Sequence, residues 1–439
     1  MNATRSGSRD GFVDVRVPGD KSITHRALML AALANGTSRL RGLLPAEDAW
    51  STVRALRALG LSAPDLPEDG GTVAISGHGL HAMRTPAGPI DCGNSGTTAR
   101  LLLGLLAGSP VSATLTGDDS LLARPMRRVT EPLASMGARF EEVGEADRLP
   151  IRITGGALQA FDYASPKASA QIKSALLLAG LTGGVEVRVS EPYLSRDHTE
   201  RMLRAMGADL SAETGPDGRP AVRLRPPELL EELDCTVPGD FSSAAYFIAL
   251  GLLGQRGGVR IPYVGVNPTR TGMLGVLRRM GAEVALEGPC DICGEPVSDL
   301  VVTPAALRAT EIGESEVPAM IDEIPVLAAL AARAEGESRI TGATELRVKE
   351  SDRIRALAEN LRAVGVEAEE LEDGLVIQGT DAPLSGDVKS FGDHRIAMAF
   401  GVLAALPGND IRIDDPDVVR ISNSDFWERL HGAAAAITA

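Results

Sequence analysis

The sequence is poor in aromatic residues, in cysteine and in positive charge. Aromatic residues make up only 3% of the 439 residues, so the core must be built from Ala, Leu, Val and Ile. Four cysteines are too few for a disulfide scaffold in a chain of this length. No apolar run reaches the roughly 18 residues that a membrane helix needs. The net charge of −15 argues against a nucleic-acid or anionic-membrane partner. These absences predict a globular, cytosolic protein of two or three domains.

A short pattern, Leu-x-x-apolar-Gly, recurs along the chain and ends at Gly60, Gly137, Gly207, Gly281 and Gly365. Each copy closes an amphipathic segment, so each glycine is predicted to follow the end of a helix, where a left-handed conformation favours Gly. The spacing indicates units of about 75 residues that mix helix and strand. The chain would then hold six units.

The segment "RLHG", which ends at Gly432, is interpreted as a degenerate sixth copy of this pattern. The tetrapeptide "VPGD" also repeats, at 17–20 and at 237–240, and Pro-Gly is typical of turns. We expect these turns to be crossings between two lobes, one made of 21–237 and the other of 1–20 with 238–439. Two crossings would form a hinge that closes on a ligand and brings Lys21 onto it.

Predicted helix starts in the first half carry small polar or cationic side chains. Free N–H groups at a helix start attract anions, and glycine lets the backbone approach a ligand closely. Because the protein is acidic overall, a cluster of cationic side chains indicates a site for a bound anion. The candidates are Lys21, Ser22, Arg26, Asn94, Gly96, Arg124, Ser169, Gln171 and Lys173.

The second half adds carboxylates to the cations. Asp322 and Glu323 lie at the edge of an apolar helix, where a carboxylate is either a helix cap or a general base. The run "RVKESDR" contains Lys349, Glu350 and Arg353, and its charges form either a solvated face or part of a site. His394 and Arg395 begin another predicted helix.

Seven motifs of this chain resemble those of the 5-enolpyruvylshikimate-3-phosphate (EPSP) synthase family, in the family's order. They are "GDKSITHRA", "GNSGTTAR", "ARPM", "SAQIKSA", "IDEIP", "RVKESDR" and "GDHRIAMA", within a match from about Val15 to Leu430. The resemblance implies a two-lobed, inside-out α/β barrel of six βαβαββ units, three per lobe, joined by a two-strand hinge. It also implies a monomer with no metal and no organic cofactor.

The reaction implied by this resemblance moves the enolpyruvyl group of phosphoenolpyruvate to the 5-hydroxyl of shikimate 3-phosphate. Asp322 would take the hydroxyl proton, and Glu350 would transfer a proton at the methylene carbon, with Lys21 as a further catalytic group. The implied phosphoenolpyruvate ligands are Lys21, Gly96, Arg124, Arg353 and Arg395, with Gln171 between the two substrates. The other implied substrate-binding residues, mainly for shikimate 3-phosphate, are Ser22, Arg26, Asn94, Ser169, Asp322 and Lys349.

Four motifs, "GDKS", "SAQIK", "RDHTE" and "NPTR", resemble the glyphosate-tolerant subclass, in which Arg196 would contact the shikimate phosphate. Tolerant members often have alanine where this chain has Gly96, so we expect intermediate tolerance. Some members also have a lysine near the C-terminal end that contacts phosphoenolpyruvate. Here only Arg420 is available.

Two alternatives remain open from the sequence. The enolpyruvyl transferase that acts on UDP-N-acetylglucosamine shares the fold but usually has a cysteine where this chain has Asp119. A binding protein that closes on an anion would not need the pair Asp322 and Glu350. The "CDIC" segment, Cys290 and Cys293, lacks a second ligand pair for zinc and is interpreted as two loop cysteines.

Overall fold

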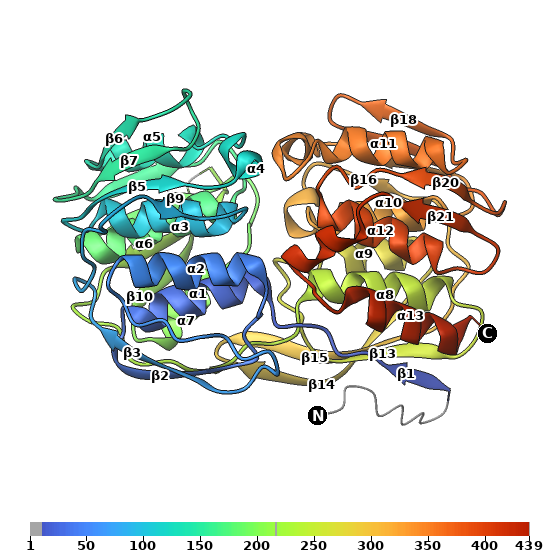
Figure 1. Ribbon diagram of the computed structural model, residues 1–439, viewed down its shortest axis with the longest axis horizontal. Helices are drawn as coiled ribbons and strands as arrows, with labels where there is room; N and C mark the ends of the chain where they lie inside the picture. The colour runs from blue at the N-terminus through green and yellow to red at the C-terminus, as the bar shows by residue number, and fades with distance from the viewer. Residues whose placement is uncertain (1–10, 216, 439) are drawn as a thin grey trace. The chain divides into compact units, whose positions relative to one another are not determined.

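The computed structural model describes residues 11–215 and 217–438, and these form two compact units. Unit 1 comprises residues up to 18, 238–291 and 296 onward; unit 2 comprises 19–237 and 292–295. Residues 1–10 of the expected second lobe lie outside the described part of the chain. The mixed α/β class is confirmed, because both units combine helices with sheets (Figure 1).

Unit 2 combines seven helices with three sheets among its described residues. Its helices are α1 (Lys21–Ala32), α2 (Glu47–Ala58), α3 (Gly96–Ala107), α4 (Asp119–Leu122), α5 (Arg127–Met136), α6 (Ala170–Gly183) and α7 (His198–Ala205). Its strands are β2 (Asn35–Arg41), β3 (Val73–His78), β4 (Ile90–Asp91), β5 (Ser112–Thr116), β6 (Arg139–Glu142), β7 (Ile151–Thr154), β8 (Phe161–Ala164), β9 (Val187–Ser190), β10 (Asp209–Thr214), β11 (Pro220–Arg225) and β12 (Asp234–Thr236). The strand orders are β12-β2-β3, β4-β5-β7-β6 and β10-β11-β9-β8.

Unit 1 also has three sheets in the described part of the chain. Its helices are α8 (Phe241–Leu253), α9 (Gly272–Arg279), α10 (Ile324–Ala331), α11 (Arg353–Ala363), α12 (His394–Ala404) and α13 (Phe426–Ile437), with short 3₁₀ turns η1 (Val317–Ala319), η2 (Thr344–Val348) and η3 (Pro416–Ile421). Its strands are β1 (Phe12–Asp14), β13 (Gly258–Gly265), β14 (Val284–Ile292), β15 (Glu295–Val302), β16 (Glu311–Ile312), β17 (Glu337–Ile340), β18 (Ala368–Leu371), β19 (Gly374–Gln378), β20 (Ser385–Val388) and β21 (Asp410–Ile413). Their orders are β1-β13-β15-β14, β16-β17-β19-β18 and β20-β21.

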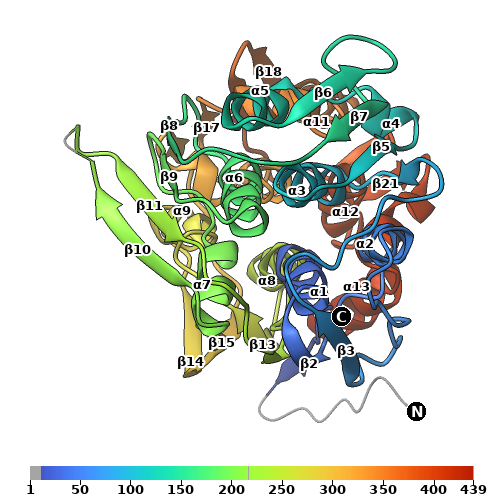
Figure 2. The ribbon, with the colours of Figure 1, turned by 90° about the vertical axis from the view of Figure 1, so that its left-hand side faces the viewer.

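Each unit is built around three helices that are buried on nearly every face. These are α1, α3 and α6 in unit 2, and α8, α10 and α12 in unit 1. A helix that is apolar all round must lie inside a core, because no face of it is suited to water. Figures 1 and 2 both show α3 and α6 lying side by side in unit 2. The polar groups at the starts of these helices are therefore held by rigid core elements.

The helix ends predicted from the repeated glycines are confirmed. Gly60, Gly137, Gly207, Gly281 and Gly365 all have a positive φ and follow α2, α5, α7, α9 and α11. The prediction of a sixth helix end, at Gly432, is wrong, because this residue lies inside α13. The described sheets are open and contain no closed barrel, so the six-unit arrangement stays a prediction.

The two "VPGD" turns lead into buried helices through their aspartates. The Asp20 side chain accepts from the Ile23 N–H at 2.9 Å and caps α1. Asp240 accepts from the Ser242 N–H at 2.7 Å and caps α8. The prediction covered both turns but not the capping role of their last residue, although Asp is a preferred N-cap residue.

Candidate active site

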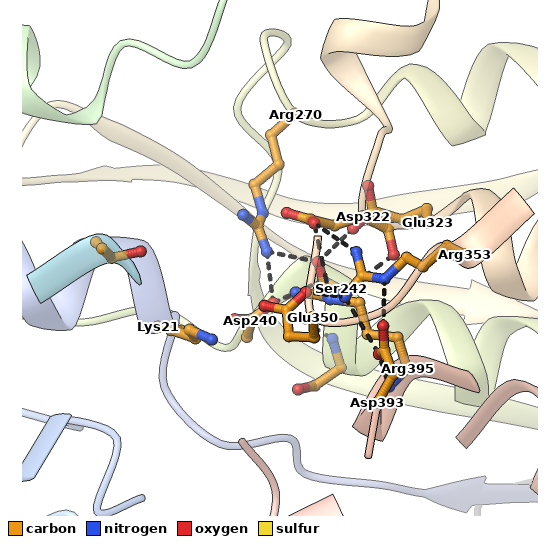
Figure 3. A network of polar contacts seen from close by, with 12 residues as sticks. Lys21, Asp240, Ser242, Arg270, Asp322, Glu323, Glu350, Arg353, Asp393 and Arg395 are labelled. Atoms are coloured by element: carbon orange, nitrogen blue, oxygen red, sulfur yellow. Dashed lines mark hydrogen bonds and ion pairs between the residues drawn. The ribbon is translucent and has the colours of Figure 1, made fainter. Parts of the chain in front are cut away.

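The candidate site in unit 1 is centred on the guanidinium group of Arg353, whose side chain is fully buried (Figure 3). Its Nε and Nη2 donate to the two carboxylate oxygens of Asp393 at 2.8 and 3.2 Å. Nη2 also donates to Glu350 at 2.6 Å, and Nη1 lies 3.5 Å from an oxygen of Asp322. Burial opposes the charge of Arg353, but Asp393 and Glu350 outweigh it and raise its pKa above the ordinary value. Arg353 therefore stays charged and holds three carboxylates in place.

Arg395 approaches the same carboxylate from α12. Its Nε lies 3.7 Å from the Asp322 carboxylate, and its Nη1 donates to the Asp322 carbonyl at 3.2 Å. Burial again works against the cation, whereas Asp322 raises the pKa of Arg395 well above the ordinary value. Two predicted phosphoenolpyruvate ligands, Arg353 and Arg395, thus both contact the predicted general base.

These side chains are positioned by the first residues of helices. Arg353 begins α11, which is capped by Asp352 through the Arg355 N–H at 3.1 Å. Arg395 is the second residue of α12, and its own N–H donates to the cap residue Asp393 at 2.9 Å. Helix starts carry free N–H groups and a positive dipole end, so they favour bound anions.

A second network in unit 1 lies under Asp322. The neighbouring carboxylate, Glu323, is fully buried and accepts a hydrogen bond from the Ser242 hydroxyl. Arg270 Nη2 donates to Ser242 Oγ at 3.0 Å and to Asp240 Oδ1 at 2.5 Å. Arg270 belongs to the "NPTR" motif, so this motif ties the start of α8 to the segment that carries Asp322.

In unit 2, the first two turns of α1 carry three of the predicted residues. Lys21 forms an ion pair with the buried Asp48 of α2 and keeps 18% of its side chain exposed. The Ser22 carbonyl accepts from Arg26 Nη1 at 3.0 Å. Arg26 also donates to Thr199 Oγ1 at 2.7 Å and to Ser174 Oγ at 2.8 Å, and it is only 4% exposed. Desolvation lowers its pKa to about 10, although Glu200 acts in the opposite direction.

The glycine-rich loop meets two arginines at the start of α3. A Cβ atom placed on Gly96 would lie 2.8 Å from Arg100 Nη1 and 2.9 Å from Arg124 Cζ. Arg100 donates to Gln171 Oε1 at 3.0 Å, and Gln171 Nε2 donates to Thr97 Oγ1 at 3.2 Å. The structure therefore brings Gly96, Arg124 and Gln171 together within unit 2.

Some predicted residues have other settings. Asn94 donates to Asp118 at 3.0 Å, and Lys349 is half-buried just after η2. The Ser169 N–H donates to Glu191 at 3.2 Å. The Arg420 side chain is 71% exposed and lies 3.5 Å from Asp417.

The interpretation of "CDIC" as two loop cysteines is half wrong. Cys290 lies within β14, whereas Cys293 lies in the turn after it and donates from its sulfur to the Asp234 carbonyl at 3.3 Å. The described residues contain no group of three or more His, Cys, Asp or Glu that could hold a metal ion. None of the described helices is both long and apolar enough to cross a membrane.

Sequence reasoning missed three buried partners. Arg100 stands inside the apolar run "ARLLLG", Asp393 precedes a helix and was not singled out, and Asp48 pairs with Lys21 across 27 positions of sequence. The only sequence signal for Asp393 was its place before His394 as a potential cap. Asp48 and Arg100 had none, because their pairing depends on tertiary contacts.

Comparison with known proteins decides the family. The family model described as "EPSP synthase (3-phosphoshikimate 1-carboxyvinyltransferase)" matches residues 11–430. The chain belongs to the EPSP synthase family. A 3-phosphoshikimate 1-carboxyvinyltransferase of Synechococcus sp. (strain RCC307) is 47% identical over 97% of both chains. One from Gloeobacter violaceus is 48% identical over 95% of both.

Solved structures of EPSP synthases agree with this assignment. The EPSP synthase of Acinetobacter baumannii is 40% identical, with a TM-score of 0.81 over 97% of this chain and 96% of that one. The enolpyruvyl transferase NikO of Streptomyces tendae is only 20% identical, with a TM-score of 0.76 over 96% and 94%, which shows a shared fold alone.

Proposed function

We infer that this chain is a transferase that moves the enolpyruvyl group of phosphoenolpyruvate to the 5-hydroxyl of shikimate 3-phosphate, a step of aromatic amino acid biosynthesis that leads to chorismate. The family match over residues 11–430 supports this reaction. The observation that carries the chemistry is the contact of Arg353 and Arg395 with Asp322 and of Arg353 with Glu350. A protein that only binds anions has no need for two carboxylates beside its cations.

The carboxylates of unit 1 are assigned the proton transfers. Glu350 protonates the methylene carbon of phosphoenolpyruvate, which leaves a cationic carbon. The 5-hydroxyl oxygen attacks that carbon while Asp322 accepts the hydroxyl proton. The resulting tetrahedral intermediate then returns a proton from its methyl group to Glu350 and releases phosphate. Arg353 and Arg395 hold the carboxylate and phosphate of the donor, where a rigid, bidentate cation stabilises developing charge.

The polar helix starts of unit 2 supply the remaining ligands. Lys21 and Arg124 are assigned to phosphoenolpyruvate, with Gly96 against it and Gln171 between the two substrates. The residues assigned to shikimate 3-phosphate, together with Lys349 and Asp322 of unit 1, are Ser22, Arg26, Ser169 and Arg196. Asn94 is a further substrate-binding residue. The Arg100–Gln171 hydrogen bond of 3.0 Å supports a fixed orientation for the Gln171 amide.

We also propose that the chain has six βαβαββ units, three in each of two lobes. The boundaries between unit 1 and unit 2 fall after Pro18 and after Val237, inside both "VPGD" turns. Each described sheet contains one parallel strand pair, which favours a repeated unit. The protein would be a monomer in the cytoplasm. Its two lobes would close when shikimate 3-phosphate is added. A radius of gyration that does not change in solution scattering would contradict closure.

The subclass proposal is intermediate tolerance of glyphosate. Its support is the "SAQIK", "RDHTE" and "NPTR" motifs, whose residues Lys173, Glu200 and Arg270 form buried ion pairs here. Gly96 acts against tolerance because it leaves room for the inhibitor. An inhibition constant far below the Michaelis constant for phosphoenolpyruvate would refute intermediate tolerance.

Phosphate release tests the proposed function directly. The purified protein is given phosphoenolpyruvate with either shikimate 3-phosphate or UDP-N-acetylglucosamine. We expect release with the first acceptor and none with the second. Release with only the second acceptor would assign the chain to the rival transferase, and release with neither would favour a binding protein.

A further inference from the structure

A buried ion cluster in unit 2 has no part in the chemistry above. Lys173 Nζ lies 2.8 Å from Glu191 Oε1 and 2.9 Å from Glu200 Oε1, and it donates to the Ser195 carbonyl at 3.1 Å. The three charged side chains are only 3–4% exposed. All three protons of the ammonium group thus have an acceptor, which is what a buried cation requires.

Glu191 makes further contacts that Glu200 does not. Its Oε2 accepts from the Ser169 N–H at 3.2 Å, and its two oxygens accept from the Ser195 hydroxyl at 2.8 and 2.7 Å. Oε1 also accepts from the Ser195 N–H at 3.1 Å. Glu191 therefore joins the residue that precedes α6 to the residue that precedes Arg196.

These contacts link the cluster to the proposed shikimate 3-phosphate ligands. Ser169 and Arg196 are both such ligands, and one carboxylate fixes the backbone at or next to each. Arg26, a third, is influenced electrostatically by Glu200 and Arg196. Burial opposes the charge of Lys173, but Glu200 and Glu191 raise its pKa, so the cluster keeps its cation at neutral pH.

We propose that Glu191, held by Lys173, is a positioning residue for shikimate 3-phosphate. It touches neither substrate; it sets the Ser169 backbone and the segment ending at Arg196 so that both meet the shikimate phosphate together. This inference rests on the proposed function, because Ser169 and Arg196 are substrate ligands only if that function holds. It gives the "SAQIK" and "RDHTE" motifs, which supply Lys173 and Arg196, a common physical purpose.

Glu200 provides a matched control. It pairs with the same Lys173 at nearly the same distance and burial, but among the described residues it accepts no hydrogen bond from Ser169 or Ser195. Glu191→Gln and Glu200→Gln each remove one negative charge from the cluster with little change of shape. Only the first removes hydrogen bonds to Ser169 and Ser195, whereas the second removes only the electrostatic influence of Glu200 on Arg26. Ser195→Ala is a milder variant that removes the hydroxyl donor without uncovering a buried charge.

The test measures the Michaelis constants of both substrates, kcat, the melting temperature, and shikimate 3-phosphate binding by calorimetry. For Glu191→Gln we expect a Michaelis constant for shikimate 3-phosphate raised about tenfold, as for loss of one or two charge-assisted hydrogen bonds. The constant for phosphoenolpyruvate and kcat should stay within about threefold. Glu200→Gln should lower the melting temperature similarly and leave both constants within about threefold.

Leu177→Ala supplies a stability control, because it weakens the core side of α6, where Leu177 is fully buried. It should lower the melting temperature without raising the Michaelis constant for shikimate 3-phosphate. If Glu191→Gln does not fold, Ser195→Ala still decides: we expect its Michaelis constant for shikimate 3-phosphate to rise about fivefold, for the loss of one hydrogen bond.

Three outcomes would overturn the inference: equal effects of Glu191→Gln and Glu200→Gln, a loss confined to kcat, or an unchanged Michaelis constant in Ser195→Ala. A failure of the proposed function is distinguishable from these, because the unaltered protein would then bind no shikimate 3-phosphate and release no phosphate.

Discussion

The carboxylate of Asp393 offers the sharpest prediction about the unit 1 site. It is fully buried, and each of its oxygens has two donors. Oδ2 accepts from Arg353 Nε at 2.8 Å and from Ser351 Oγ at 3.1 Å. Oδ1 accepts from Arg353 Nη2 at 3.2 Å and from the Arg395 N–H at 2.9 Å. In Asp393→Asn, one oxygen becomes an amino group, so one contact with Arg353 places two donors against each other.

The cost of this change follows from the contacts that remain. Breaking a buried ion pair typically costs about 3–5 kcal/mol. Asparagine still caps α12 well, and Glu350 still pairs with Arg353 at 2.6 Å, so we expect a loss of about 2–3 kcal/mol in the free energy of unfolding. Because Arg353 would shift away from its place beside Asp322, kcat should fall about 10- to 100-fold.

Urea unfolding and phosphate release measure the two effects. Asp410→Asn is the matched control in the same unit, because the Asp410 and Arg412 side chains are 69% and 75% exposed and lie 3.5 Å apart. Such a surface pair contributes at most about 1 kcal/mol, so we expect little change in that variant. If Asp393→Asn unfolded at the same urea concentration as Asp410→Asn and kept full kcat, the role given to Asp393 would be wrong.

Two further predictions concern unit 2. In Gly96→Ala, the new Cβ would lie 2.8 Å from Arg100 Nη1 and 2.9 Å from Arg124 Cζ, so both guanidinium groups must move. We therefore expect the Michaelis constant for phosphoenolpyruvate to rise about tenfold in steady-state kinetics. An unchanged constant would contradict the placement of Arg124. Burial lowers the pKa of His25 from 6.5 to about 3, although Asp48 opposes this shift. Below pH 6.5 the unfolded chain therefore binds a proton at His25 that the folded chain does not bind. The stability that comes from neutral His25 is fully present above pH 6.5, and the free energy of unfolding falls by about 1.4 kcal/mol for each pH unit below it. Urea unfolding between about pH 5.5 and 4.5 measures how steeply the free energy of unfolding falls with pH. This slope should be shallower in His25→Asn than in the natural protein by about 1.4 kcal/mol per pH unit, and equal slopes would refute the neutral, buried His25.

Local signals predicted the parts of the fold that depend on neighbouring residues. The five helix ends were found because glycine adopts, with the least strain, the positive φ of the residue that follows each helix. Gly432 ends only a degenerate copy of the pattern and does not follow a helix, since α13 continues past it to Ile437. The "VPGD" turns were recognised from proline and glycine, but the capping aspartates were not.

The site was predicted less completely, because buried ion pairs join residues far apart in the sequence. The helix starts that carry Lys21 and Arg395 were recognised from the residues, whereas Arg353 was recognised only as part of a charged run. The roles of all three came from the family resemblance. Asp393 and Arg100 were missed, since local sequence does not show that a charged residue has a partner 40 or 71 positions away. For the same reason, the contact of Glu191 with the Ser169 N–H, 22 positions away, was not predicted.

The most direct test of the account is kcat for Asp322→Asn, measured by phosphate release with both substrates saturating. Asparagine keeps the size of the side chain and a hydrogen-bond acceptor, but it cannot take a proton from the 5-hydroxyl. If Asp322 is the general base, kcat should fall about 10²- to 10⁴-fold. A kcat equal to that of the unaltered protein would contradict the assignment of Asp322 and, with it, the proposed proton transfers of the unit 1 site.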